Sequence, residues 1–315
     1  MTKSIEQIAS THLGKAGDGT IVKPYVTPTA IDKSLLVPVP RILNRTQYNI
    51  DENALPFVGY DVWNSYEFST LTDNGYPVVG HLKLVYSSDS EFIVESKSLK
   101  LYLNSFNMVH LGKTSFDAIL KAEQIIKTDL RKILGNSVDV TIFDSLECSS
   151  ISYSKNSNPI SPLFVSLETL CNVNDIVFDR YTEAPDLLTG TLNERKTSIK
   201  VHTPVLRSNC RVTNQPDWGD VFIYMLSNHK ISYNGLMKYL VSMRSENHFH
   251  EEICECIYKR LYDTFNPDEL FVSCLYTRRG GIDINPVRAS SDSIIDIISP
   301  RLVSPSTYVQ KLWRQ

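Results

Sequence analysis

The chain has 315 residues, 42% of them hydrophobic, so it is long enough for two domains or for two halves that share one core. Its 32 basic and 35 acidic residues give a net charge of -3, which excludes the basic surface typical of a protein that binds nucleic acid directly. Because no apolar run approaches the roughly 20 residues of a membrane helix and the start lacks the apolar core of a signal peptide, we expect a cytoplasmic protein without membrane partners.

The N-terminal segment, residues 1–58, contains five prolines among polar residues. This composition favours an extended N-terminal arm that lies over the core that follows. After it, DVWNSYEFSTL and VVGHLKLVY flank the turn sequence TDNGYP. The alternation of apolar and polar residues on both sides of that turn predicts a β-hairpin.

A long helix is predicted for residues 114–135, because apolar side chains recur there at helical spacing. Ser115 is available as its cap and Gly135 as its stop. The next stretch, SVDVTIF, is typical of a strand, and an earlier helix is expected to begin near Glu95. Residues 59–150 are therefore interpreted as a first module.

The second half repeats this order of elements, and SLKLYLNS of the first half aligns with GLMKYLVS of the second at Leu, Tyr, Leu and Ser. The repetition predicts an α+β fold in which antiparallel strands alternate with pairs of helices. Residues 151–315 would hold a connection and a second module. Its predicted elements are strands over 203–213, 219–226 and 268–276 and helices over 232–244 and 249–265.

The sequence SNCRVTNQPDWG places Cys210 seven residues before Asp217, across a segment rich in turn-forming residues. A strand that folds back here brings the carboxyl group toward the thiol. A thiol and a nearby acid suit nucleophilic addition followed by protonation. A buried cysteine next to an aspartate that caps a turn gives the same spacing, so both interpretations stay open at this point.

The sequence NHFHEEICEC gathers two histidines and two cysteines. Residues two apart on a helix point about 200° away from each other, so neither pair can chelate a metal from one helical face. The pattern leaves His250 and Glu251 in the first helical turn, as an acid-base pair or as a solvated helix start. The six cysteines are irregularly spaced, which indicates thiols and not a disulfide framework.

Two further stretches carry groups that suit phosphate. Glu95, Ser96 and Lys97 stand at an expected helix start, where free N–H groups, a hydroxyl and an ammonium favour an anion. In YTRRGG, two arginines precede two glycines, and flexible backbone beside guanidinium groups can wrap a polyphosphate. An ordinary helix cap and an ordinary surface turn are the alternatives.

In this order, the motifs ESKSLKLYLNSFN, SNCRVTNQPDWG, FHE and YTRRGGIDINP closely resemble the long, two-module 7-cyano-7-deazaguanine reductases, the nitrile reductases of queuosine biosynthesis. The resemblance covers most of the chain from about Tyr60. It implies two tandem tunnelling-fold modules, each an antiparallel sheet with a helix pair packed on one face, and a homodimer. It also implies reduction of the nitrile of 7-cyano-7-deazaguanine to a primary amine through a covalent thioimide, with two NADPH per turnover and no metal.

The resemblance also implies roles for individual residues. Cys210 would add to the nitrile carbon, Asp217 would protonate the nitrogen, and His250 would assist proton transfer. The residues implied in substrate binding are Val94, Glu95, Ser96, Phe249, His250 and Glu251. The residues implied in NADPH binding are Ser96, Lys97, Arg279 and Gly280.

Two other functions are compatible with parts of this pattern. A pterin or purine cyclohydrolase of the same superfamily would need a set of zinc ligands, which the helix geometry does not favour. A non-catalytic purine-binding module would keep the glutamates and leave the thiol and its acid idle.

Overall fold

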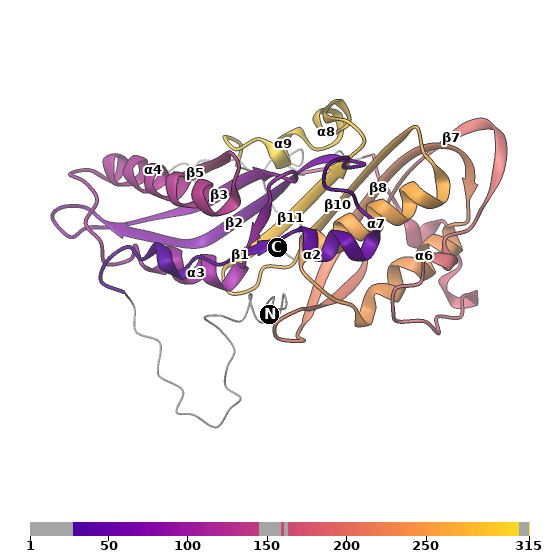
Figure 1. Ribbon diagram of the computed structural model, residues 1–315, viewed down its shortest axis with the longest axis horizontal. Helices are drawn as coiled ribbons and strands as arrows, with labels where there is room; N and C mark the ends of the chain where they lie inside the picture. Colours follow the sequence, from indigo (N-terminus) through magenta and orange to yellow (C-terminus); the bar gives the residue numbers. More distant parts are fainter. Residues whose placement is uncertain (1–27, 145–158, 161–162, 309–314) are drawn as a thin grey trace, which may run out of the picture.

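The computed structural model describes residues 28–144, 159–160, 163–308 and 315. They form a mixed α+β fold around one nine-stranded sheet (Figure 1). The strands of this sheet are β2 (Val58–Leu71), β3 (Pro77–Ser87), β5 (Val138–Asp144), β6 (Val165–Ser166), β7 (Gly190–Cys210), β8 (Pro216–Ile231), β9 (Asn247–His248), β10 (Glu269–Tyr276) and β11 (Ile282–Ala289). Their order is β5-β3-β2-β11-β10-β8-β7-β6, with β9 beside β7. A separate antiparallel pair joins β1 (Pro38–Pro40) to β4 (Phe92–Val94).

The helices lie between the strands in the chain. The α-helices are α2 (Ile42–Arg45), α3 (Ser96–Asn104), α4 (Ser115–Leu134), α6 (Tyr233–Ser242), α7 (His250–Phe265), α8 (Asp292–Ile298) and α9 (Pro300–Val303). The short 3₁₀ helices are η1 (Lys33–Leu35), η2 (Thr46–Tyr48), η3 (Leu167–Thr169), η4 (Val173–Asp175), η5 (Pro185–Leu187) and η6 (Met243–Ser245). Within the described ranges, no helix is both long and apolar enough to cross a membrane.

The elements predicted from local patterns are present. The β2–β3 hairpin and helices α3, α4, α6 and α7 all occur within a few residues of their predicted bounds. One detail differs, because Thr114 and not Ser115 caps α4, through a capping box with Asp117. Gly135 ends the helix in the left-handed region, with a φ of 69°.

The strand alternation sends successive side chains to opposite faces of the sheet. On one face, two hydrophobic clusters lie beneath the helix pair α3–α4 and the helix pair α6–α7. Val272 of the second cluster pairs with Arg288 of β11, and Ile284 of the first cluster lies four residues before Arg288 on the same strand. Because alternate residues of a strand share a face, both clusters lie on the same side of the sheet. The opposite face, around Val62 and Phe271, is covered by α8 and α9.

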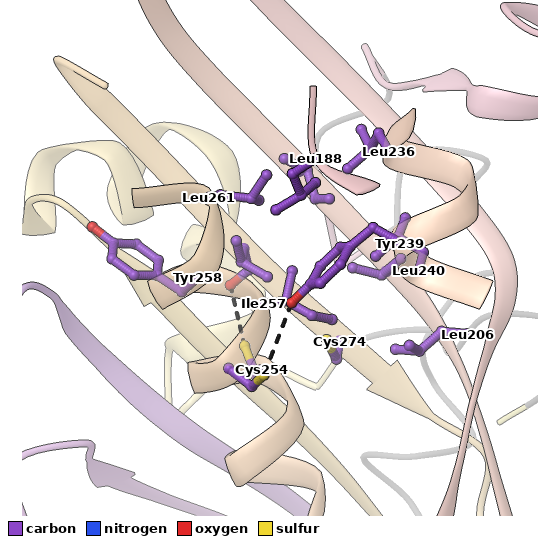
Figure 2. Packing of buried hydrophobic residues seen from close by; sticks show 14 of the residues in the cluster. Leu188, Leu206, Leu236, Tyr239, Leu240, Cys254, Ile257, Tyr258, Leu261 and Cys274 are labelled. Carbon is purple, nitrogen blue, oxygen red and sulfur yellow. Dashed lines mark hydrogen bonds between the residues drawn. The ribbon is translucent and has the colours of Figure 1, made fainter. Parts of the chain in front are cut away.

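The cluster beneath α6 and α7 is closely packed (Figure 2). Leu236 and Tyr239 of α6 turn toward Ile257 and Leu261 of α7, and all four side chains are buried. Tyr239 and Cys256 meet across the helix pair, with the hydroxyl oxygen 3.9 Å from the sulfur. Each such apolar side chain contributes about 1.5–3 kcal/mol when it is fully buried.

The N-terminal segment does more than lie over the core. Its described part, from residue 28, supplies Tyr48 and Phe57 to the cluster beneath α6 and α7. It also places Arg41 and Arg45 in the interior, and Figure 1 shows α2 between α3 and α7. The proline-rich composition predicted an extended arm, and it did not reveal these buried groups. Residues 1–27 of the predicted arm lie outside the described residues.

Three further charged side chains converge with those arginines: Arg288, Asp61 and Glu255. Arg288 of β11 pairs with Asp61 of β2 at 2.9 Å and with Glu255 of α7 at 2.8 Å. Arg45 also pairs with Glu255, at 2.8 Å, and Arg41 pairs with Asp61. Burial raises the pKa of Glu255, but the surrounding arginines outweigh burial and lower it to about 2. Buried charges need such partners, so the cluster holds β2, β11, α7 and the N-terminal segment together.

The second hairpin extends further than predicted. Strand β7 begins at Gly190, well before the predicted strand over 203–213, and ends at Cys210. Its first half was missed because both of its faces are largely exposed, so the sequence lacks an apolar alternation there. Strand β11 and helices α8 and α9 were also not predicted. Residues 145–150 of the predicted first module, and residues 151–158 and 161–162 of the predicted connection, lie outside the described residues.

Candidate active site

A cavity of about 270 Å³ opens on the face of the sheet that carries the helix pairs α3–α4 and α6–α7, between these two pairs. The first residues of α3 and α7 both border it, so two helix N-termini converge on one space. Free N–H groups at those ends favour an anion or a hydrogen-bond acceptor. The lining residues are Trp63, Val94, Ser96, Lys97, Lys100, Cys210, Gln215, Asp217, His248, Phe249, His250, Glu251, Arg279, Gly280, Ile282 and Ile284.

All but one of the residues expected at the site line this cavity. The exception is Glu95, which lies between two lining residues, Val94 and Ser96. Its carboxylate caps α3 by accepting the backbone N–H groups of Lys97 at 3.1 Å and Ser98 at 2.7 Å. Burial raises the pKa of Glu95, although these hydrogen bonds oppose the increase. In the ligand-free chain, Glu95 therefore works as a helix cap.

The turn between β7 and β8 brings the thiol and the acid together. Cys210 closes the turn by donating its N–H to the Gln215 carbonyl at 2.8 Å and accepting the N–H of Asn214 at 2.9 Å. Asn214 adopts a φ of 54°, which asparagine tolerates better than most residues. Asp217 of β8 pairs with Ser208 of β7 in the antiparallel register, and Ser208 lies two residues before Cys210. Because alternate residues share a face, the side chains of Cys210 and Asp217 emerge on the same side.

Asp217 is buried, and the side chains of His250 and Arg279 lie next to it. His250 Nε2 lies 3.4 Å from its Oδ2, and the guanidinium of Arg279 pairs with its Oδ1. Burial raises the pKa of Asp217, but the hydrogen bonds and charges of His250 and Arg279 outweigh burial and lower it overall. The group is therefore a carboxylate in the ligand-free protein at neutral pH. The imidazole of His250 is held flat against Tyr276, with ring centroids 3.9 Å apart.

Glu251 lies at the start of α7 with an exposed fraction of 2%. Its Oε1 accepts no hydrogen bond from the described residues. Burial and the charge of Asp61 raise the pKa of Glu251 to about 8. A buried carboxyl group without a partner is costly, and a ligand with adjacent N–H donors would provide one.

The mouth of the cavity carries positive charge. Lys97 and Lys100 come from α3, and Arg279 comes from the turn between β10 and β11. That turn contains Gly280 and Gly281 with φ values of 58° and 81°, a conformation that favours glycine. Lys100 fastens the turn by donating to the Gly280 carbonyl at 2.6 Å. These cations suit a ligand that carries phosphate groups.

Several lining residues escaped the sequence analysis. Trp63 and Ile284 come from neighbouring strands and form an apolar wall, a role that alternation alone cannot distinguish from core packing. His248 is the partner of Cys210 in the parallel pairing of β9 with β7. Burial lowers the pKa of His248, but hydrogen bonds with Glu246 and Glu252 outweigh burial and raise it overall. The sequence NHFHEE indicated His248 only as a possible metal ligand.

Metal ligands were tested as well. Within the part of the chain that the structure describes, no three His, Cys, Asp or Glu side chains gather in a way that could hold a metal ion. The two neighbouring cysteines of α7 are directed into the apolar core, where burial raises the pKa of Cys256 to about 12.

The fold and the cavity define a mixed α+β protein with an accessible thiol, buried carboxyl groups and a cationic mouth at one site. Residues 27–142 match the family described as nitrile reductase, 7-cyano-7-deazaguanine-reductase N-term, and residues 216–294 match QueF-like protein. The chain belongs to the family of NADPH-dependent 7-cyano-7-deazaguanine reductases.

Individual relatives extend over most of the chain. A protein of this name from Colwellia psychrerythraea is 41% identical, over 81% of this chain and 86% of its own length. One from Legionella pneumophila strain Lens is 38% identical, over 85% of this chain and 88% of its own length. One from Dechloromonas aromatica is 37% identical, over 93% and 96%. The crystal structure of an archaeosine synthase QueF-Like in the apo form matches at 17% identity with a TM-score of 0.27, covering 30% of this chain and 91% of that chain.

Proposed function

We propose that this protein is an oxidoreductase that uses NADPH to reduce the nitrile of 7-cyano-7-deazaguanine to 7-aminomethyl-7-deazaguanine, a step of queuosine biosynthesis. The observation that carries the proposal is the single cavity lined by the thiol of Cys210 and the carboxyl groups of Asp217 and Glu251. Family membership supports the substrate and the cofactor.

The first chemical step is addition of the Cys210 sulfur to the nitrile carbon, which gives a covalent thioimide. Because Asp217 is ionised in the free protein, it accepts the thiol proton as the sulfur attacks. It then passes this proton to the nitrile nitrogen, where the electrons of the broken π bond collect. His250, 3.4 Å from Asp217, keeps the carboxylate oriented and assists the transfer.

Reduction of a nitrile to a primary amine takes four electrons, so two NADPH are consumed, each supplying one hydride. After the first hydride reaches carbon, the carbon–sulfur bond breaks and Cys210 is released as the thiol, leaving an imine. The second hydride reduces the imine to the amine. In both steps the chain has to deliver a proton to nitrogen, and Asp217 with His250 is the lining pair suited to this role.

The deazaguanine ring is recognised through its N–H edge. Glu251 is the proposed acceptor, because its Oε1 accepts no hydrogen bond from the residues that the structure describes and a carboxylate can accept two adjacent N–H groups. Val94, Ser96 and Phe249 contact the ring in this proposal, and all three line the cavity. Glu95 joins them only if its hydrogen bonds to α3 are exchanged for bonds to the ligand.

The residues at the mouth fit a phosphate-bearing cofactor. Lys97 and Arg279 supply positive charge, and Ser96 stands at the N-terminus of α3, where backbone N–H groups favour an anion. Gly280 follows Arg279 in a left-handed conformation, so no side chain obstructs a close approach there. We propose that these four residues hold the phosphates of NADPH.

We also propose that residues 59–150 and 151–315 are two tandem tunnelling-fold modules that follow an N-terminal segment, 1–58. The recurring order strand, strand, helix, helix, strand supports this division, as do the two hydrophobic clusters beneath the two helix pairs. In the described part, the second half contributes four long strands to the sheet and the first half three. The homodimer and the cytoplasmic location stay predictions.

Incubation with the nitrile in the absence of NADPH tests the proposal. The intact mass should increase by the mass of one 7-cyano-7-deazaguanine, and the adduct should map to Cys210. The Cys210→Ala variant should show no adduct, whereas Cys171→Ala, at another partly exposed thiol, should behave as the wild type. A wild-type protein that binds the purine without an adduct would indicate a non-catalytic purine-binding module. Bound zinc would favour the cyclohydrolase.

A further inference from the structure

Arg279 lies between the carboxylate of Asp217 and the proposed phosphate site of NADPH. Its backbone is anchored, because its N–H donates to the Ile282 carbonyl at 2.9 Å and its carbonyl accepts the Ile282 N–H at 3.1 Å. Its side chain pairs with Asp217 of β8 and donates to the side chain of Gln215 in the turn between β7 and β8. The exposed fraction of the Arg279 side chain is 31%, against 4% for Asp217. One guanidinium therefore covers a buried carboxylate while facing solvent.

Lys97 and Lys100 line the same cavity as this guanidinium. Under the proposed function, NADPH brings several negative charges to this place. A guanidinium has a limited set of N–H donors in a fixed plane, and those of Arg279 that point to β8 are already engaged. A phosphate that recruits Arg279 in the same bidentate manner has to displace Asp217.

We propose that Asp217 and a phosphate group of NADPH compete for Arg279, so that binding of the dinucleotide leaves the Asp217 carboxylate without its guanidinium partner. This inference rests on the proposed function. The groups that then face Asp217 are His250 of α7, Tyr276 of β10 and Cys210 of β7. With one positive charge fewer, the buried carboxylate binds a proton more readily.

The competition would give Asp217 two states matched to two steps. Before NADPH binds, Asp217 paired with Arg279 is a carboxylate and can take the proton of the Cys210 thiol. After NADPH binds, Asp217 takes a proton from solvent and can give it to the substrate nitrogen as hydride adds to carbon. Arg279 is thus a positioning residue that acts through Asp217.

The test measures binding of NADP⁺, which occupies the cofactor site and cannot transfer hydride. Isothermal titration calorimetry gives its Kd for the wild type, Asp217→Asn, Arg279→Gln and the double variant. If Asp217 competes for Arg279, Asp217→Asn should bind NADP⁺ about 3- to 10-fold more tightly, and Arg279→Gln should bind it more weakly. In the Arg279→Gln background, Asp217→Asn should change the Kd by less than about twofold.

A change of net charge alone is controlled by Asp139→Asn, which removes an exposed carboxylate of β5 whose partner is Lys127. This variant should bind NADP⁺ like the wild type. If Asp217→Asn leaves the Kd unchanged or weakens binding while the wild type binds, the competition is refuted and the proposed function stands. If the wild type does not bind NADP⁺, the competition and the proposed NADPH-dependent function are both refuted. Adduct formation at Cys210 then reports on the nitrile chemistry alone.

A second readout follows from the proton that Asp217 takes up. Titration of the wild type with NADP⁺ in buffers of different ionisation enthalpy should show proton uptake, and Asp217→Asn should show less of it. Equal uptake in the two proteins would contradict the competition. Thermal melting of each variant without ligand confirms that it is folded.

Discussion

Glu251 of α7 is buried within electrostatic range of Asp61 of β2, and burial together with this negative charge raises the pKa of Glu251 to about 8. Asp61 has its own partners, since Arg288 donates to it at 2.9 Å and Arg41 pairs with it as well. Among the described residues, Glu251 has no hydrogen-bond partner for its Oε1. Glu251 is therefore protonated at neutral pH, and it borders the cavity.

The first prediction concerns substrate binding. If the carboxylate form of Glu251 accepts the N–H edge of the purine, binding releases the proton that Glu251 carries below about pH 8. The affinity for the purine should therefore increase with pH, by up to about tenfold per pH unit, and level off above the pKa of Glu251. Calorimetry with Cys210→Ala, which cannot form the adduct, measures the Kd and the protons released. Glu251→Gln should bind more weakly and independently of pH, and a wild type that takes up protons would contradict this role.

The second prediction concerns stability. The pKa of Glu251 is higher in the folded chain than its ordinary 4.5, so the folded state holds a proton that the unfolded state loses between about pH 4.5 and 8. Stability from this group is fully present below the lower value and decreases as pH rises to the higher one. Glu251→Gln should remove this decrease, so its melting temperature should exceed that of the wild type at pH 8.5. Parallel melting curves of the two proteins between pH 5 and pH 8.5 would argue against it.

The third prediction concerns the buried charge cluster. Arg288→Met should reduce the free energy of unfolding by about 3–5 kcal/mol, because Asp61 and Glu255 stay buried after losing a partner. Lys127→Met is the matched control, since it breaks the exposed pair with Asp139 and should cost less than about 1 kcal/mol. Urea unfolding followed by fluorescence measures both. Similar losses in the two variants would show that the cluster contributes no more than a surface pair.

The fourth prediction concerns thiol reactivity. In the native protein, iodoacetamide should label Cys210 long before Cys254, Cys256 and Cys274, which are fully buried. Burial also raises the pKa of Cys256 and Cys274, so little thiolate is available there. Peptide mass spectrometry after a short pulse of reagent gives the labelled fraction of each thiol. Preincubation with the nitrile should protect Cys210 and leave the slow labelling of the other three unchanged.

The family could be inferred from sequence because its motifs are local. Each stretch spans few residues, and a turn such as TNQP fixes the relation of Cys210 to Asp217 without help from the rest of the chain. The helix starts at Ser96 and His250 were predictable for the same reason. The actual role of Glu95 as the cap of α3 was harder to foresee, because one carboxylate can serve a helix N-terminus or a ligand equally well.

By itself, the sequence determined the β2–β3 hairpin, helices α3, α4, α6 and α7, and the turn that holds an acid near a thiol. These depend on periodicity, caps and turn residues that act over a few positions. Only the tertiary structure decided that the N-termini of α3 and α7 border one cavity, because the pairing of β11 with β2 joins strands that are far apart in the chain. It also decided that Arg279 pairs with Asp217 and that Glu251 lies near Asp61, since the charge of a buried group depends on which distant residues become its neighbours.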